Sequence, residues 1–147
     1  MLKGINPILT PDLLKYLAEM GHGDELVIAD GNFPAASMAR NLVRLDGIGA
    51  TEALDAILSV FPLDQYDVGN FLVMEVVPGD PVGGADGRPA IWTEFERVLD
   101  KWEPKAAIGS LERFTYYERA KKAYLVIATG ETAQYANVIL KKGVVKK

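Results

Sequence analysis

The sequence predicts an α/β layered protein with a largely parallel or mixed sheet. Two observations support this prediction. Helix-like and strand-like segments alternate along the chain, and its 147 residues fit one compact domain, residues 1–147. No internal repeat interrupts the alternation, and the glycine-rich stretch 78–89 is too short to be more than an insertion.

Four helices are expected, and the first has the clearest start signal. In Thr10-Pro11-Asp12 a hydroxyl N-cap precedes a proline in the first turn and an acid near the positive end. The apolar residues that follow at helical spacing are Leu13, Leu14, Leu17 and Met20, with Gly21 as the expected C′ residue. Further helices are predicted over 51–60, 90–102 and 113–122, and the spacing puts Trp102 on an apolar side.

Four strands are expected from short apolar runs rich in β-branched and aromatic residues. They cover 25–29, 71–77, 124–128 and 137–140, and the first of them is followed by a loop over 31–34. The stretch 78–89 holds four glycines and three prolines, which predicts an exposed loop.

The composition excludes several classes of protein. A net charge of −4 and a pI of about 5.0 argue against a nucleic-acid partner, which needs a basic patch. The absence of cysteine rules out disulfides, thiolate catalysis and cysteine-ligated zinc. No apolar run approaches the ~20 residues that span a bilayer, and no signal-peptide pattern is apparent. We therefore expect a cytoplasmic protein without a membrane partner.

The only histidine, His22, is the first candidate for chemistry. Histidine is the side chain whose ordinary pKa lies near neutrality, so it suits acid–base catalysis. Gly21 and Gly23 flank it, which allows unusual backbone angles and close approach of a ligand. The alternative is a surface histidine that caps the end of the first helix.

Asp30 is the second candidate, because it ends the first predicted strand. A carboxylate there can accept hydrogen bonds from sugar hydroxyls or orient an imidazole. The alternative is a purely structural Asx-turn in Asp30-Gly31-Asn32, which spacing alone favours. One histidine with Asp24 and Asp30 does not make a closed zinc site, and no EF-hand spacing is present, so we expect no metal site.

Two further segments carry groups that suit sugar binding. Arg113 offers forked donors, and the neighbouring aromatic residues offer faces that stack on sugar rings. The alternative, which the segment on its own favours, is an amphipathic helix with Phe114 and Tyr117 in the core. Tyr135 and Asn137 offer a hydroxyl and a carboxamide before the last strand, or else form a turn. No dinucleotide or P-loop motif is present, and no nucleophile elbow supports a hydrolase.

Several segments, in order along the chain, resemble the ribose pyranase / fucose mutarotase (RbsD/FucU) family. They are the opening 1–15, Leu17-Ala-Glu-Met-Gly-His-Gly-Asp24, Asp30-Gly-Asn-Phe-Pro-Ala35, Arg113-Phe-Thr-Tyr-Tyr-Glu-Arg-Ala120, and Thr129-Gly-Glu-Thr-Ala-Gln-Tyr-Ala-Asn137 with Leu140-Lys-Lys-Gly-Val144. Arg113 stands where the ribose branch is expected to have a histidine, which favours the fucose mutarotase branch. Only 79–105, with Trp92 and Trp102, diverges.

The resemblance implies a three-layer α/β/α fold of the RbsD type. It also implies a cofactor-independent mutarotase that acts on a free monosaccharide, with L-fucose as the favoured substrate. It implies that His22 is the catalytic acid/base and that sugar is bound by Asp30, Arg113, Tyr135 and Asn137. Tyr117 is a speculative second proton-transfer group. A ring-shaped homo-oligomer is implied, an octamer or a decamer, with sites where subunits meet. D-Ribose pyranase activity and non-catalytic sugar binding are the alternatives.

Overall fold

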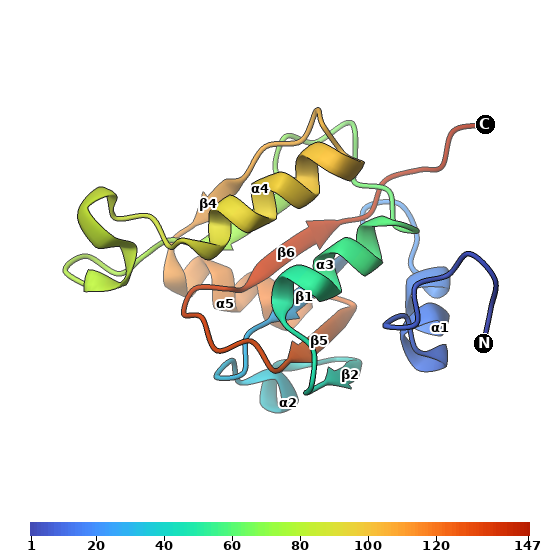
Figure 1. The fold of residues 1–147 in the computed structure, drawn as a ribbon, viewed down its shortest axis with the longest axis horizontal. Coiled ribbons are helices and arrows are strands. Elements are labelled where there is room, and N and C mark those ends of the chain that lie inside the picture. Colours follow the sequence, from blue (N-terminus) through green and yellow to red (C-terminus); the bar gives the residue numbers. More distant parts are fainter.

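The computed structural model describes residues 1–147 as one six-stranded sheet with helices on both faces (Figure 1). The strands are β1 (Glu25–Ala29), β2 (Leu42–Leu45), β3 (Phe71–Met74), β4 (Gly109–Leu111), β5 (Leu125–Thr129) and β6 (Val138–Lys141). The helices are α1 (Pro11–Glu19), α2 (Ala35–Met38), α3 (Ala50–Leu58), α4 (Ile91–Trp102) and α5 (Arg113–Lys122). All predicted helices and strands are present, with ends that differ from the prediction by at most three residues.

The sheet has the order β2-β5-β1-β6-β3-β4. The pairs β2–β5, β5–β1 and β3–β4 are parallel, whereas β6 runs antiparallel to both β1 and β3. The prediction of a mixed, largely parallel sheet is confirmed. Because β6 is reversed, its first residues lie beside the carboxyl ends of β1 and β3.

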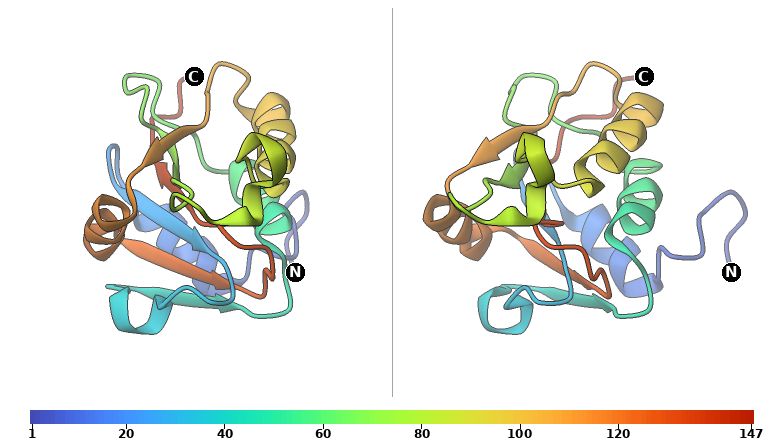
Figure 2. Two further views of the ribbon diagram at one scale, coloured as in Figure 1. Left: turned by 90° about the vertical axis from the view of Figure 1, so that its left-hand side faces the viewer. Right: turned by 60° about the vertical axis from the view of Figure 1, so that its left-hand side comes forward.

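Two apolar layers cover the sheet, which confirms the three-layer α/β/α arrangement. The larger layer, of 27 buried residues, packs α1, α3 and α4 on one face, and the smaller, of 11, packs α2 and α5 on the other. Figure 2 shows α3 and α4 on one side of the sheet and α5 on the opposite side. In β1, Leu26 and Ile28 face the first layer, while Val27 and Ala29 face the second. A strand buried on both faces reads as a continuous apolar run, so periodicity alone could not assign its faces.

The local signals at the ends of α1 were partly right. Thr10 accepts a hydrogen bond from the Leu13 N–H (3.3 Å), so the predicted N-cap is present. Gly21 follows the C-cap Met20 and so occupies the predicted C′ position, but it does not adopt the left-handed conformation typical of a C′ glycine, and the chain leaves α1 in an extended conformation. The left-handed residue is Gly23 (φ 88°), whose N–H donates to the Lys142 carbonyl at 2.8 Å.

The elements that the sequence did not predict are short. They are α2, β2, β4 and a 3-10 segment over Pro81–Asp86, inside the stretch expected to be a loop. Of these, α2, β2 and β4 have only three or four residues, which are too few to show a period. The strand predicted over 71–77 ends at Met74 because its neighbours end there: Val73 pairs with the first residue of β6, and Met74 with the last of β4. No helix is long and apolar enough to cross a bilayer.

Two expected core positions are wrong. Trp102 keeps 37% of its surface exposed, because it lies in the last turn of α4 and its indole N–H donates to Asp55 Oδ1 at 2.6 Å. In α5, Phe114 is 67% exposed, and Tyr116 is buried instead. Two residues along a helix turn the side chain to nearly the opposite side, so burial of Tyr116 directs Phe114 to solvent.

Candidate active site

A pocket of about 280 Å³ lies at the carboxyl ends of β1 and β3. We call it the strand-end pocket. Its walls include five of the six site residues expected from the sequence, which are Asp30, Arg113, Tyr117, Tyr135 and Asn137. They come from the end of β1, the first two turns of α5, and the connection from β5 to β6. The fold therefore gathers residues that are more than 100 positions apart in the sequence.

Asp30 and Asn137 form a reciprocal pair at the base of the strand-end pocket. The Asp30 N–H donates to Asn137 Oδ1, and Asn137 Nδ2 donates to Asp30 Oδ2, both at 2.8 Å. Asp30 also accepts a hydrogen bond from the Asn32 N–H (3.0 Å), so the Asx-turn considered above is present too. Burial raises the pKa of the Asp30 carboxyl, against the lowering effect of the bonds from Asn32 and Asn137. The carboxylate is thus held in place but incompletely solvated, as expected of a group that awaits hydroxyl donors.

Replacing Asn137 by alanine is expected to lower the free energy of unfolding by about 2–4 kcal/mol at pH 7, because a buried N–H and a buried carboxylate lose their partner. The raised pKa means that ionisation of Asp30 costs stability as the pH rises through that pKa. The hydrogen bond from Asn137 stabilises the ionised form of Asp30. The decrease in the free energy of unfolding caused by Asn137→Ala is therefore expected to become smaller as the pH falls toward 3.8. Urea unfolding at several pH values measures both effects.

The matched control is Gln134→Ala, in the same connection but exposed. It is expected to change the free energy of unfolding by less than about 0.5 kcal/mol. Equal losses in the two variants would contradict a structural role for the pair of Asp30 and Asn137.

Tyr135 is fixed by the segment that diverges in sequence. Its hydroxyl donates to Asp80 Oδ2 (2.8 Å) and accepts from the Val77 N–H (3.2 Å), while the Trp92 indole N–H donates to its carbonyl (2.9 Å). Tyr135 has φ 58°, a left-handed conformation that is uncommon for a bulky residue. Burial is the largest cause of its raised pKa, so the hydroxyl stays protonated and can donate.

Asp80 was missed by the sequence analysis, although it is one of the residues lining the strand-end pocket. It lies in the stretch expected to be a plain loop, and no local pattern distinguishes it from a turn aspartate. In the structure Asp80 stabilises a turn, because its Oδ1 accepts from the Val82 N–H. It also holds Tyr135, because its Oδ2 accepts from the Tyr135 hydroxyl.

Arg113 and Tyr117 approach the strand-end pocket from α5. Glu112 caps this helix through bonds from the Phe114 and Thr115 N–H groups (3.0 and 3.1 Å), which sets the position of Arg113 at the first turn. The Arg113 guanidinium lies 5.3 Å from the centre of the Phe114 ring and has no carboxylate partner. A guanidinium that no carboxylate neutralises keeps its donors available to a ligand. The Tyr117 ring lies 5.8 Å from that of Phe33.

His22 lies at the opposite end of β1, in the turn between α1 and β1. Its side chain is 47% exposed, and Nε2 lies 3.2 Å from Asp64 Oδ1. It bonds to Asp64, not to the end of α1, so the capping alternative is not seen. The five residues of β1 put about 17 Å of strand between His22 and Asp30. Within one chain, His22 therefore does not meet the strand-end pocket or Tyr117.

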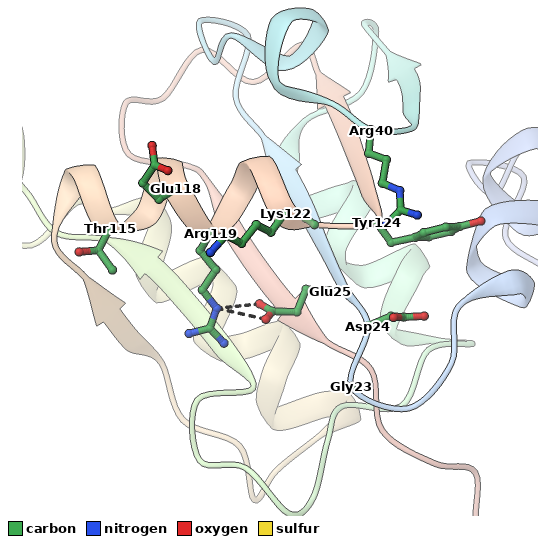
Figure 3. Close-up of a pocket in the computed structure, with 10 residues that line it drawn as sticks. Gly23, Asp24, Glu25, Arg40, Thr115, Glu118, Arg119, Lys122 and Tyr124 are labelled. Atoms are coloured by element: carbon green, nitrogen blue, oxygen red, sulfur yellow. Dashed lines mark hydrogen bonds and ion pairs between the residues drawn. The ribbon is translucent and has the colours of Figure 1, made fainter.

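A larger hollow of about 440 Å³ lies beside the His22 turn, between residues 23–25 and α5 (Figure 3). Arg119 Nε donates to both carboxylate oxygens of Glu25, at 3.0 and 3.1 Å, and the pair occupies the centre of the view. The walls carry charges of both signs and none of the residues expected to bind sugar. Size alone therefore does not identify the site, and the smaller strand-end pocket is the better candidate.

The fold and the strand-end pocket define an α/β protein that binds a small ligand rich in hydroxyl groups. Carboxylate, carboxamide, phenol and guanidinium groups converge there beside aromatic rings, and no three acidic or histidine side chains are grouped to hold a metal ion. The chain belongs to the RbsD / FucU transport protein family, whose model matches residues 3–145.

Similar proteins cover nearly the whole chain. The human fucose mutarotase is 49% identical over 146 residues, which are 97% of this chain and 94% of that protein. The structure of FucU from Bifidobacterium longum is 55% identical, with a TM-score of 0.92 over 98% of this chain and 100% of the other. The fucose mutarotase of Streptococcus pneumoniae, solved in complex with L-fucose, is 47% identical, with a TM-score of 0.90 over 99% and 100%.

Proposed function

We propose that this chain is a cofactor-independent mutarotase that interconverts the α and β anomers of L-fucose. The observation that carries the proposal is the strand-end pocket, which collects an unpaired guanidinium and a buried carboxylate at one end of the sheet. The likeness to fucose mutarotases, one of them solved with L-fucose, supports this sugar before D-ribose.

The reaction needs only proton transfers. One proton leaves the anomeric hydroxyl while another arrives on the ring oxygen, and the C1–O5 bond breaks to give the open aldehyde. Rotation about the C1–C2 bond and the reverse transfers close the other anomer. A group that titrates near neutrality serves both directions, and well-placed acid–base catalysis contributes about 10²–10⁴-fold. In the proposal, His22 exchanges the proton with the sugar.

The pocket residues divide the remaining work. Asp30 accepts hydrogen bonds from sugar hydroxyls, and Asn137 keeps its carboxylate oriented. Arg113 orients the sugar with its forked donors. Tyr135 is held in place by its hydrogen bond to Asp80, and it contacts the sugar as part of the pocket wall. Tyr117, whose ring is close to Phe33, is the proposed second proton-transfer group.

The proposed site needs a second copy of the chain. Because β1 separates His22 from Asp30, the histidine of one subunit would meet the strand-end pocket of the next. Such a head-to-tail contact is heterologous and closes into a ring, here proposed as an octamer or a decamer. Large exposed side chains at both ends support the contact: Tyr66, whose ring lies 5.8 Å from that of His22, is 70% exposed, and Phe114 is 67% exposed beside Arg113. The lack of cysteine fits the cytoplasmic location that we also propose.

Magnetisation-transfer NMR on the free sugars tests this proposal. Inverting the signal of one anomer of L-fucose is expected to affect the other faster in the presence of the protein. D-Ribose is expected to show a weaker effect. Faster pyranose–furanose exchange of ribose alone would favour the ribose pyranase alternative. Saturable binding of L-fucose without faster exchange would reduce the protein to a sugar-binding oligomer.

A further inference from the structure

Asp64 is the acidic side chain that forms a hydrogen bond with His22, and its position was not expected from the sequence. It lies before β3, and its Oδ1 is 3.2 Å from His22 Nε2. The side chain is only 7% exposed, whereas that of His22 is 47% exposed. The contact joins the α1–β1 turn to the segment between α3 and β3, at the end of the sheet away from the strand-end pocket.

The surroundings of Asp64 hold its carboxylate in one place. Oδ1 also accepts from the Tyr66 N–H at 3.0 Å, which forms an Asx-turn. The Asp64 N–H donates to the Lys141 carbonyl (3.0 Å), and the Asp64 carbonyl accepts from Asn70 Nδ2 (2.8 Å). The Tyr66 N–H is the largest cause of the lowered pKa of Asp64, and the bond to His22 acts in the same direction. Asp64 is therefore an ionised group that can only accept hydrogen bonds.

An acceptor at 3.2 Å determines which histidine nitrogen carries the proton. To bond to a carboxylate, Nε2 must be the protonated nitrogen, and in the neutral ring Nδ1 then keeps a free lone pair. When Nδ1 takes up a proton, the ring becomes an imidazolium next to a fixed negative charge. This is the arrangement by which an acid orients a catalytic histidine and stabilises its charged form.

We propose that Asp64 is a positioning residue for His22: it holds the Nε2–H tautomer, so that Nδ1 is the atom that exchanges the proton with the sugar. The proposal rests on the proposed acid–base role of His22. At the start Nδ1 accepts the proton of the anomeric hydroxyl, and at reclosure it returns a proton to that oxygen. Asp64 itself keeps its charge throughout.

Two variants of Asp64 and one control test this. Asp64→Asn keeps an oxygen for the Tyr66 N–H and for Nε2–H but removes the charge, whereas Asp64→Ala removes both. The control is Asp67→Ala, in the same loop. Asp67 forms a similar Asx-turn, with Oδ1 accepting from the Gly69 N–H at 2.7 Å, but its other partner is Lys141, not His22.

The first measurement is independent of activity. Because the chain has a single histidine, ¹⁵N-labelled histidine gives one Nδ1 and one Nε2 signal. The wild type and Asp67→Ala are expected to show a protonated Nε2 and a lone-pair Nδ1. In Asp64→Ala the ¹⁵N chemical shifts of Nδ1 and Nε2 are expected to move toward each other as the second tautomer becomes populated. Asp64→Asn is expected to give shifts between those of the wild type and Asp64→Ala. A protonated Nδ1 in the wild type, or identical shifts in all four proteins, would overturn the proposal.

The second measurement is anomer exchange of L-fucose by the same proteins. Loss of a hydrogen bond to a charged group predicts a kcat on the order of 10- to 100-fold lower for Asp64→Ala, with KM nearly unchanged. Asp64→Asn is expected to recover part of kcat, and Asp67→Ala all of it. An inactive wild type would contradict the proposed function itself. An active wild type with Asp64 variants of equal kcat would contradict only the role of Asp64.

Discussion

Replacing His22 by alanine is expected to slow the exchange of L-fucose anomers by about 10²–10⁴-fold, the usual contribution of a well-placed acid–base group. The structure gives the reason to expect little else to change. The side chain is 47% exposed and its one hydrogen bond is to Asp64, so its loss leaves no cavity in the core.

Binding provides the control for this result. The residues of the strand-end pocket are untouched in His22→Ala, so saturable binding of L-fucose is expected to persist by calorimetry. Circular dichroism and thermal unfolding are expected to match the wild type. Exchange at the wild-type rate in a folded His22→Ala protein would remove His22 from the mechanism and leave Tyr117 as the next candidate.

Activity is expected to rise when two impaired variants share one ring. In His22→Ala the strand-end pocket is intact, and in Arg113→Ala the histidine is intact. Arg113 has no carboxylate partner, so this variant is expected to fold normally but to lose about 10- to 100-fold in kcat/KM. If each site takes His22 from one subunit and the pocket from its neighbour, random mixing restores roughly a quarter of the sites. Co-expression, with a different tag on each chain, and the exchange assay on doubly tagged rings measure this.

The matched control is co-expression of His22→Ala with the double variant His22→Ala/Arg113→Ala. No subunit then supplies a histidine, and no recovery is expected. The outcome that would refute a shared site is mixed rings of the first pair that are no more active than either parent. Light scattering on the wild type tests the ring directly, since a 16.0 kDa species would leave the site incomplete.

Prediction from the sequence worked where a segment was long enough to show its period or had a specific start signal. The helix at 113–122 agrees with α5 at both ends, and the strand at 25–29 agrees with β1. It failed for β2 and β4, which are strands only because an edge of the sheet offers them a partner. The burial of Trp102 and Phe114 was also wrong, because which side of a helix faces the sheet depends on the packing of its neighbours.

For the candidate site, the residue types and the family motifs were enough to select Asp30, Arg113, Tyr117, Tyr135 and Asn137 together, and the fold brings all five to one pocket. The supporting residues were beyond reach of the sequence. Asp80, Trp92 and Asp64 each act through a single hydrogen bond to a distant residue, at a separation of 42 positions or more. No local pattern records such a contact.

The sequence by itself determined the alternation of helices and strands, the family, and the residues with suitable chemistry, because these depend on side-chain type and on spacing within one segment. Only the tertiary structure decided how those residues are distributed. The register of β1 between β5 and β6 directs Asp30 to one end of the sheet and leaves His22 at the other. A strand is rigid and cannot bend its two ends together, so His22 with Asp64 and the strand-end pocket lie apart within one chain, as the two halves of the site that we propose.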